Sequence, residues 1–213
     1  MRLVDLTIKD FSDQVDSSSP APGGGSVSAL SSNLGVSLSR MMANLSFGKK
    51  KYEALDEAIK EEFKSRFEKL GNIRDEFLNL IDEDTKSFNE VMKAFKLPKE
   101  TEEEKKIRKE AIQQATIKST QVPLKTAKLS LEALRLMEYF IEYGNQNAIT
   151  DLGVGSLLVY SGLEGAILNV KVNLLGIDDQ ELVNNMNKEC QDILEEGKKI
   201  NDNILNQVHE RLK

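Results

Sequence analysis

Asp84 is the residue best placed for proton-transfer chemistry, because it interrupts the apolar stripe of a predicted helix. The other members of the stripe recur at helical spacing, and they are Ile73, Phe77, Leu80, Phe88, Val91 and Phe95. An ionised carboxylate buried without partners is costly, so we expect Asp84 to be protonated, paired or facing a polar cavity. An ion pair with a lysine or arginine of another helix would make it structural. A carboxylate in a partly dry cleft would instead suit acid–base catalysis.

A second candidate site is the run Pro20-Ala21-Pro22-Gly23-Gly24-Gly25-Ser26, which directly precedes a long helical pattern. The prolines restrict the approach, and the glycines let backbone N–H groups face a ligand without interference from Cβ atoms. Free N–H groups and the positive end of the helix dipole converge at such a turn, so it could bind an anion or a polar ligand. A tight turn into a packed helix would explain the same residues equally well. The run is not a P-loop, because no Gly-Lys-Ser/Thr follows it and no strand pattern precedes it.

A third candidate is a line of small and amide residues along an otherwise apolar helix expected over residues 148–174. Its members are Asp151, Gly155, Gly162, Gly165, Asn169 and Asn173. Each glycine inside a helix costs about 1 kcal/mol, so their alignment indicates that something packs very closely there. The line is either a close helix–helix contact or the wall of a flat ligand slot whose amides bind a heterocycle. A membrane span is disfavoured, since Glu164 and Lys171 interrupt the run.

The elements that would position these residues are helices, and no strand pattern is convincing. Thr101 and Glu104 form a capping-box pattern, Leu97-Pro98 and Gly176 are stop signals, and Pro123 predicts a kink. The sequence therefore predicts one all-α domain over residues 1–213, an elongated antiparallel bundle of five to six helices. The expected ranges are 6–15, 26–45, 52–95, 102–143, 148–174 and 178–212.

Composition narrows the function further. A net charge of −6 argues against nucleic-acid binding, because no basic excess is available to meet phosphates. Cys190 lies on the apolar stripe of the last helix and is expected in the core. It is the only cysteine, and the N-terminal residues lack the apolar segment of a signal peptide, so we expect a cytoplasmic protein. His209 is the only histidine, which disfavours a di-iron site, a zinc site and a Ser-His-Asp triad; we therefore expect no metal.

Short segments spread in order along nearly the whole chain carry a family resemblance. They are Pro20 to Val27, Gly48-Lys49-Lys50, Asp82 to Phe88, Leu97-Pro98-Lys99, Val122-Pro123-Leu124, Gly144-Asn145 and Asn169 to Leu174. The chain resembles the cyclodeaminase/cyclohydrolase family of folate enzymes. That family includes the C-terminal domain of formiminotransferase-cyclodeaminase and stand-alone methenyltetrahydrofolate cyclohydrolases.

The resemblance implies an all-helical homodimer that binds folate near the subunit boundary. It also implies one-carbon chemistry at the N5/N10 carbon of tetrahydrofolate, with no metal and no cofactor beyond the folate substrate. Water would open the methenyl bridge to give a formyl group, or N10 would close on a formimino carbon with loss of ammonia. The family's aspartate falls on Asp84, or on Asp82 if the motif is read one pair earlier.

For binding, the resemblance implies that a few polar residues hold the pterin edge or the glutamyl carboxylate: Gly23, Gly24, Gly25, Ser26, Asn145, Asp151, Asn169 and Asn173. Lys49 and Lys50 would meet a polyglutamate tail where the substrate carries one, although a solvated helix end explains them better. The sequence has no formiminotransferase domain attached, which favours the hydrolase slightly. The alternative function is a non-catalytic folate-binding or scaffold dimer, with no nucleic-acid or membrane partner.

Overall fold

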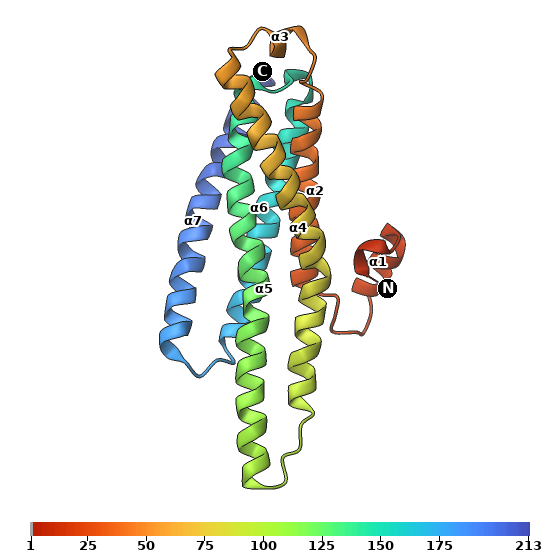
Figure 1. Cartoon of the computed structure of the whole chain (residues 1–213), viewed down its shortest axis with the longest axis vertical. Coiled ribbons are helices and arrows are strands. Elements are labelled where there is room, and N and C mark those ends of the chain that lie inside the picture. The colour runs from red at the N-terminus through yellow and green to blue at the C-terminus, as the bar shows by residue number, and fades with distance from the viewer. Residues whose placement is uncertain (1) are drawn as a thin grey trace.

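The computed structural model describes residues 2–213 as a long bundle of α-helices (Figure 1). In these residues no strand is present, which confirms the all-α prediction. Five long helices form the bundle, and two short helices and two 3₁₀ turns complete the chain. In order the elements are η1 (Leu3–Asp5), α1 (Ile8–Val15), α2 (Gly24–Asn44), α3 (Lys50–Glu53), α4 (Glu57–Phe95), α5 (Glu102–Tyr143), η2 (Gln146–Ala148), α6 (Ile149–Leu174) and α7 (Gln180–Arg211).

The helix α6 lies against α2, α5 and α7, and α2 also packs on α4. Gly24 lies beside Asn169 and Gly35 beside Gly155, so α2 and α6 run antiparallel. The two longest helices, α4 and α5, extend beyond the others at one end, whereas α2 begins part-way along them (Figure 1). The first turn of α2 therefore lies at a step in the bundle, with Gly24 exposed and Gly25 and Ser26 buried.

Local sequence signals set most helix ends. The Thr101 side chain accepts a hydrogen bond from the Glu104 N–H and the Glu104 side chain accepts one from the Thr101 N–H, so α5 begins with the predicted capping box. Its bounds agree with the predicted range 102–143, and the helix continues without interruption through Pro123. The Asp179 side chain caps α7 by accepting a hydrogen bond from the Leu182 N–H at 3.0 Å. Gly23 gives α2 no side-chain cap, so the free N–H groups of this helix need partners from elsewhere.

The predicted helix over residues 52–95 is wrong at its start, because the chain breaks between α3 and α4 at Ala54–Asp56. The break lets Tyr52 turn inward onto Phe63, with ring centroids 5.3 Å apart, and Phe47 packs edge-on against both. These aromatic contacts close the end of the bundle where α2, α3 and α4 meet.

Residues 146–174 are long and apolar enough to cross a membrane by length and composition. Half of their apolar 18-residue stretch, however, is buried inside the protein. The buried side chains of α6, among them Leu163, Ile167 and Val170, belong to the common core with α2, α5 and α7. This is the pattern of the central helix of a bundle. Cys190 is also fully buried in that core, as predicted.

Candidate active site

Asp84 projects from α4 onto the first turn of α2. Its Oδ2 atom accepts a hydrogen bond from the Ser26 N–H at 2.9 Å and lies 3.1 Å from the Ser26 hydroxyl oxygen. The carboxyl group thus satisfies one of the N–H groups that the uncapped helix leaves free. A negative charge at this place is also favoured by the positive end of the α2 dipole.

Burial dominates the electrostatics of Asp84. Loss of hydration raises the pKa of Asp84 above its ordinary value, and the hydrogen bonds from the Ser26 side chain and backbone oppose this only in part. The ion pair considered from the sequence is not observed, since none of the ion pairs found within residues 2–213 includes Asp84. A mostly buried carboxyl held by neutral donors can exchange a proton more readily near neutral pH than one held by a cation.

The glycines of the turn leave room for the side chains around them. A Cβ atom on Gly25 would overlap Oδ1 of Asp84, and one on Gly24 would lie 3.0 Å from Nδ2 of Asn169. Gly23 is less constrained, because a Cβ there would meet only the carbonyl oxygen of Pro20 at 3.4 Å. The turn therefore lies between a carboxyl group on one side and an amide on the other, and close contact requires a glycine at position 25 and favours one at position 24.

The line of small residues on α6 forms the close helix–helix contact considered from the sequence. Gly155 packs against Gly35 and Ser39, and Gly162 against Ser28 and Ser32, so these glycines allow α2 to lie close to α6. Asn169 stands at the end of the line. It donates to its own helix at the Gly165 carbonyl oxygen (2.9 Å) and keeps its side chain beside Gly24. Asn173 is half-buried one turn further along α6.

Three of the candidate residues lie at the other end of α2. Lys49 and Asn145 line a separate pocket with Tyr52 and Tyr143, and Asp151 is in the first turn of α6 nearby. The 21 residues of α2 span about 30 Å, so one chain does not bring these residues to Asp84. Asn145 has a local role, since its side chain donates to the Leu45 carbonyl oxygen at 3.0 Å and accepts from the Asn147 N–H at 3.1 Å.

Asp82, the other aspartate considered, faces away from the glycine turn. It accepts a hydrogen bond from the Leu3 N–H at 2.5 Å and pairs with Arg2 at 3.1 Å. Asp82 therefore fastens the N-terminal segment to α4, and Asp84 is the aspartate that meets the glycine turn.

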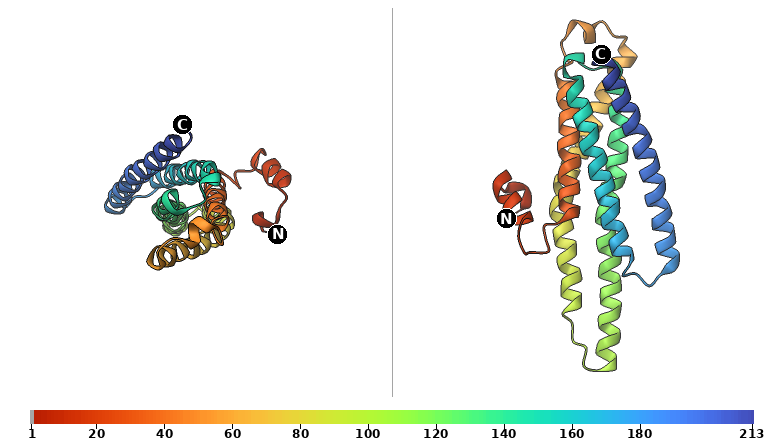
Figure 2. Two further views of the ribbon diagram at one scale, coloured as in Figure 1. Left: turned by 90° about the horizontal axis from the view of Figure 1, so that it is seen from above. Right: turned by 180° about the vertical axis from the view of Figure 1, so that it is seen from behind.

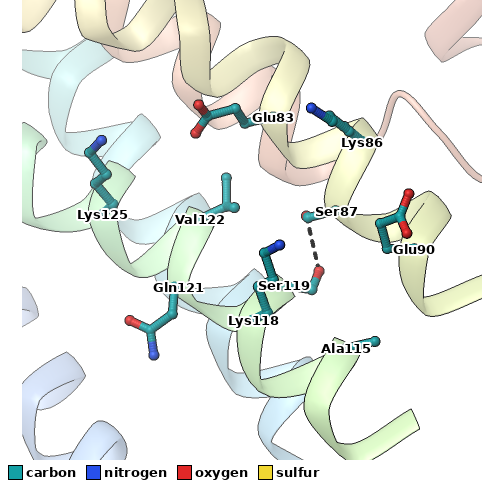
Figure 3. A pocket seen from close by; sticks show the side chains of 10 residues that line it. All are labelled: Glu83, Lys86, Ser87, Glu90, Ala115, Lys118, Ser119, Gln121, Val122 and Lys125. Atoms are coloured by element: carbon teal, nitrogen blue, oxygen red, sulfur yellow. Dashed lines mark hydrogen bonds between the residues drawn. The ribbon is translucent and has the colours of Figure 1, made fainter. Parts of the chain in front are cut away.

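A groove of about 380 Å³ between α4 and α5 was not anticipated from the sequence (Figure 3). Its floor is the contact between the Ser87 and Ser119 hydroxyls, 3.1 Å apart, and Ser87 also donates to the Asp84 carbonyl oxygen at 2.9 Å. Charged side chains of both signs surround it: Glu83, Lys86, Glu90, Lys118 and Lys125. The spacing of seven between Lys118 and Lys125 is the one sequence signal that could have indicated this groove.

The residues that the structure describes contain no group of three or more histidine, cysteine, aspartate or glutamate side chains arranged to hold a metal ion. The polar groups gathered at Asp84 are instead one carboxyl, backbone N–H groups, small hydroxyls and an amide. That set can hold a planar polar molecule by hydrogen bonds and can move a proton at one position.

Comparison with known proteins shows the family. The family model described as formiminotransferase-cyclodeaminase matches residues 7–192. The chain belongs to this family. Methenyltetrahydrofolate cyclohydrolase of Methylorubrum extorquens is 38% identical over 206 residues, which are 97% of this chain and 97% of that protein.

Two further relatives extend the comparison. Formimidoyltransferase-cyclodeaminase of Gallus gallus is 32% identical over 92% of this chain, which spans only 36% of that longer protein. The crystal structure of formiminotetrahydrofolate cyclodeaminase from Thermotoga maritima is similar along the whole chain, with a TM-score of 0.78 and 26% identity. The match covers 99% of this chain and 98% of that one. The all-α bundle is therefore the fold of this family.

Proposed function

We propose that this protein is a folate one-carbon enzyme that acts at the carbon between N5 and N10 of tetrahydrofolate, and that hydrolysis of methenyltetrahydrofolate is its main reaction. The observation that carries the proposal is the buried Asp84 carboxyl held against the open glycine turn, with Asn169 opposite. The similarity to a cyclohydrolase over nearly the full length of both chains supports the choice of reaction.

In this reaction Asp84 acts first as a base. Water adds to the methenyl carbon while the ionised carboxyl takes one proton from it, and the cationic N5–C–N10 unit becomes a neutral tetrahedral carbon. The bond from carbon to N5 then breaks, N5 receives the proton from Asp84, and the remaining hydroxyl proton leaves to solvent as the formyl C=O forms. The negative carboxylate beside the cation also stabilises the substrate and the first transition state.

Cyclodeamination of formiminotetrahydrofolate is the second candidate, and the likeness to the Thermotoga maritima enzyme favours it. N10 attacks the carbon of the protonated formimino group (–CH=NH₂⁺), and Asp84 takes the proton from N10. The same proton then passes to the –NH₂ group on the tetrahedral carbon, which leaves as ammonia. The two reactions need one carboxyl group in the same place. They differ in whether water can reach the carbon.

The residues around Asp84 would bind the substrate. Gly23, Gly24 and the amides of Asn169 and Asn173 fit the edge of the pterin ring, whose N–H and C=O groups need partners in one plane. The reaction needs no cofactor beyond the folate itself. The acidic net charge and the fully buried free thiol of Cys190 suit a cytoplasmic enzyme.

We further propose that the protein is a homodimer joined through α2 and α6. On α2 the side chains of Val27, Leu34 and Met41 recur every seven residues and remain 39–49% exposed. On α6 the exposed apolar residues are Val154, Leu157, Leu168 and Val172. The two helices lie side by side on one face of the bundle (Figure 2), so their exposed stripes can form one apolar surface for a second copy. Stable interfaces of this kind bury more than about 2,000 Å² in total.

One assay separates the candidate functions, because methenyltetrahydrofolate absorbs in the near ultraviolet. Loss of this absorbance after enzyme is added to methenyltetrahydrofolate shows hydrolysis, and its appearance from formiminotetrahydrofolate shows cyclodeamination. If neither signal changes while the protein still binds the folate, the protein is a non-catalytic binding or scaffold dimer and the proposed function is wrong.

A further inference from the structure

The Ser26 hydroxyl is fully buried and lies among three oxygen atoms. Oδ2 of Asp84 is 3.1 Å away, the carbonyl oxygen of Ile81 is 2.8 Å away, and Oγ1 of Thr85 is 3.3 Å away. A hydroxyl group carries a single proton, so it can donate to only one of these three oxygens at a time. The partner that it chooses depends on the charge of Asp84.

The two oxygens of the Asp84 carboxyl have different surroundings. Both hydrogen bonds found for this carboxyl end at Oδ2, and both come from Ser26. Oδ1 lies where a side chain of residue 25 would stand, and glycine leaves that space free. Ser26 thus holds one oxygen and leaves the other beside Gly25.

In both ionisation states of Asp84, the Ser26 hydroxyl has an acceptor for its proton. When the carboxyl is ionised, Oδ2 is a strong acceptor and attracts both the Ser26 N–H and the Ser26 hydroxyl. When a proton is bound at Oδ1, Oδ2 becomes a weaker carbonyl-type acceptor that keeps the N–H bond. The hydroxyl can then donate to the Ile81 carbonyl oxygen, which is the nearest of the three oxygens.

We propose that Ser26 is a positioning residue for Asp84: it holds Oδ2 in place so that Oδ1 takes and returns the proton, and its hydroxyl alternates between Oδ2 and the Ile81 carbonyl oxygen. This inference rests on the proposed function for its role in turnover. It also changes the expectation from the sequence, in which Ser26 was a substrate-binding residue. Ser26 acts through Asp84 without touching the substrate.

The charged groups around Asp84 do not hold one of its carboxyl oxygens in place as Ser26 does. From α2 it is faced by Ser26 and Gly25, and from α6 Asn169 lies across the glycine turn. On its own helix, Asp82 pairs with Arg2 of the N-terminal segment. Glu83 and Lys86 line the groove between α4 and α5, together with Lys118 and Lys125 of α5. Burial raises the pKa of Asp84 and the hydrogen bonds from Ser26 oppose that rise, so the Ser26 hydroxyl is the group to test.

The test is Ser26→Ala, studied without and with substrate. Without substrate, the ionisation of Asp84 is followed by ¹³C NMR of labelled aspartate carboxyls, with the signal assigned by its loss in Asp84→Asn. Removal of the hydroxyl takes a donor from the ionised form, so the midpoint should rise by about one pH unit. With substrate, the acid limb of kcat/KM should move up by the same amount, and activity should recover as the pH is raised.

Ser39→Ala is the matched control, because Ser39 is also fully buried on α2 but donates only to the Gly35 carbonyl oxygen, at 3.0 Å. It should leave both midpoints unchanged. If Ser26→Ala does not fold, Ser26→Cys keeps the volume with a weaker donor and should move the midpoints in the same direction by less. An unchanged midpoint in a folded Ser26 variant would overturn the inference. An inactive wild-type protein would refute the proposed function alone, since the NMR titration needs no turnover.

Discussion

At the scale of single residues, the site is defined by what surrounds one carboxyl group. Asp84 is held by the backbone and hydroxyl of Ser26, where an ion pair would have lowered its pKa and made it a poor proton carrier. Apolar periodicity around Asp84 was enough to select it from the sequence. The hydroxyl of Ser26 could not be assigned in this way, because its partners come from a helix that lies 55 to 59 residues further along the chain.

The raised pKa of Asp84 predicts how stability depends on pH. Because the folded-state pKa lies above the unfolded-state value of about 3.9, the wild type should lose stability relative to Asp84→Asn as the pH rises through the interval between the two values. Above that interval the difference should be constant. Urea unfolding of both proteins between about pH 3 and 8 measures it. A wild type that gains stability relative to Asp84→Asn as the pH rises would mean that the pKa of Asp84 is lowered in the folded state.

Gly24→Ala should weaken folate binding more than it lowers thermal stability. The added Cβ would lie 3.0 Å from Nδ2 of Asn169, so the amide must move, whereas the backbone at the exposed Gly24 can accept a methyl group. Equilibrium binding of the folate and the melting temperature are measured on the same preparation. Gly176→Ala is the control, since a Cβ there makes only ordinary contacts, at 3.6 Å and beyond. Unchanged affinity in Gly24→Ala would reduce the glycine turn to a structural feature.

At the scale of elements, helix boundaries set by local signals could be predicted from the sequence, whereas boundaries set by tertiary contacts could not. The capping box fixes the start of α5 through atoms only three residues apart, so its boundary could be predicted from the sequence. The break between α3 and α4 depends on Tyr52 packing against Phe63, a contact that no local pattern reveals. The pairing of α2 with α6 could be suspected from the aligned glycines, but the partner helix could not be named.

The exposed stripe on α2 predicts a defined effect on assembly. Leu34→Glu places a charge at the centre of the apolar face, so the dimer should dissociate at micromolar concentration while the helix content stays the same. Sedimentation velocity measures the change. Ile107→Glu is the matched control, because Ile107 is 52% exposed on α5, away from this face, and should leave the dimer intact. A wild-type protein that sediments as a monomer would refute the α2–α6 interface.

At the scale of the whole molecule, the bundle separates two groups of candidate residues. Asp84, the glycine turn and Asn169 meet at the step where α2 begins, whereas Lys49, Asn145 and Asp151 lie about 30 Å away at the far end of α2. The order of these residues in the sequence does not reveal this distance, because it depends on the length and direction of the helices. Lys49 and its neighbours therefore have no assigned part in the reaction within one chain.

In the proposed mechanism a side chain transfers the proton, so the activity should be insensitive to chelators. Dialysis against EDTA should leave the rate of methenyltetrahydrofolate loss unchanged, because the polar groups at the site are a carboxyl, hydroxyls and amides. The rate is measured before and after dialysis, and again after Zn²⁺ or Mg²⁺ is added back. A rate that falls on dialysis and returns with one of these metals would contradict this assignment.

The most direct test of the central claim compares turnover of methenyltetrahydrofolate by the wild type and by Asp84→Asn, followed by the loss of near-ultraviolet absorbance. The amide keeps the shape of the side chain and can still accept a hydrogen bond from Ser26, but it cannot take up the proton. We predict that kcat falls by about 10²- to 10⁴-fold while the circular dichroism spectrum is retained. An Asp84→Asn protein with wild-type kcat would show that Asp84 only caps α2, and the proposed mechanism would be wrong.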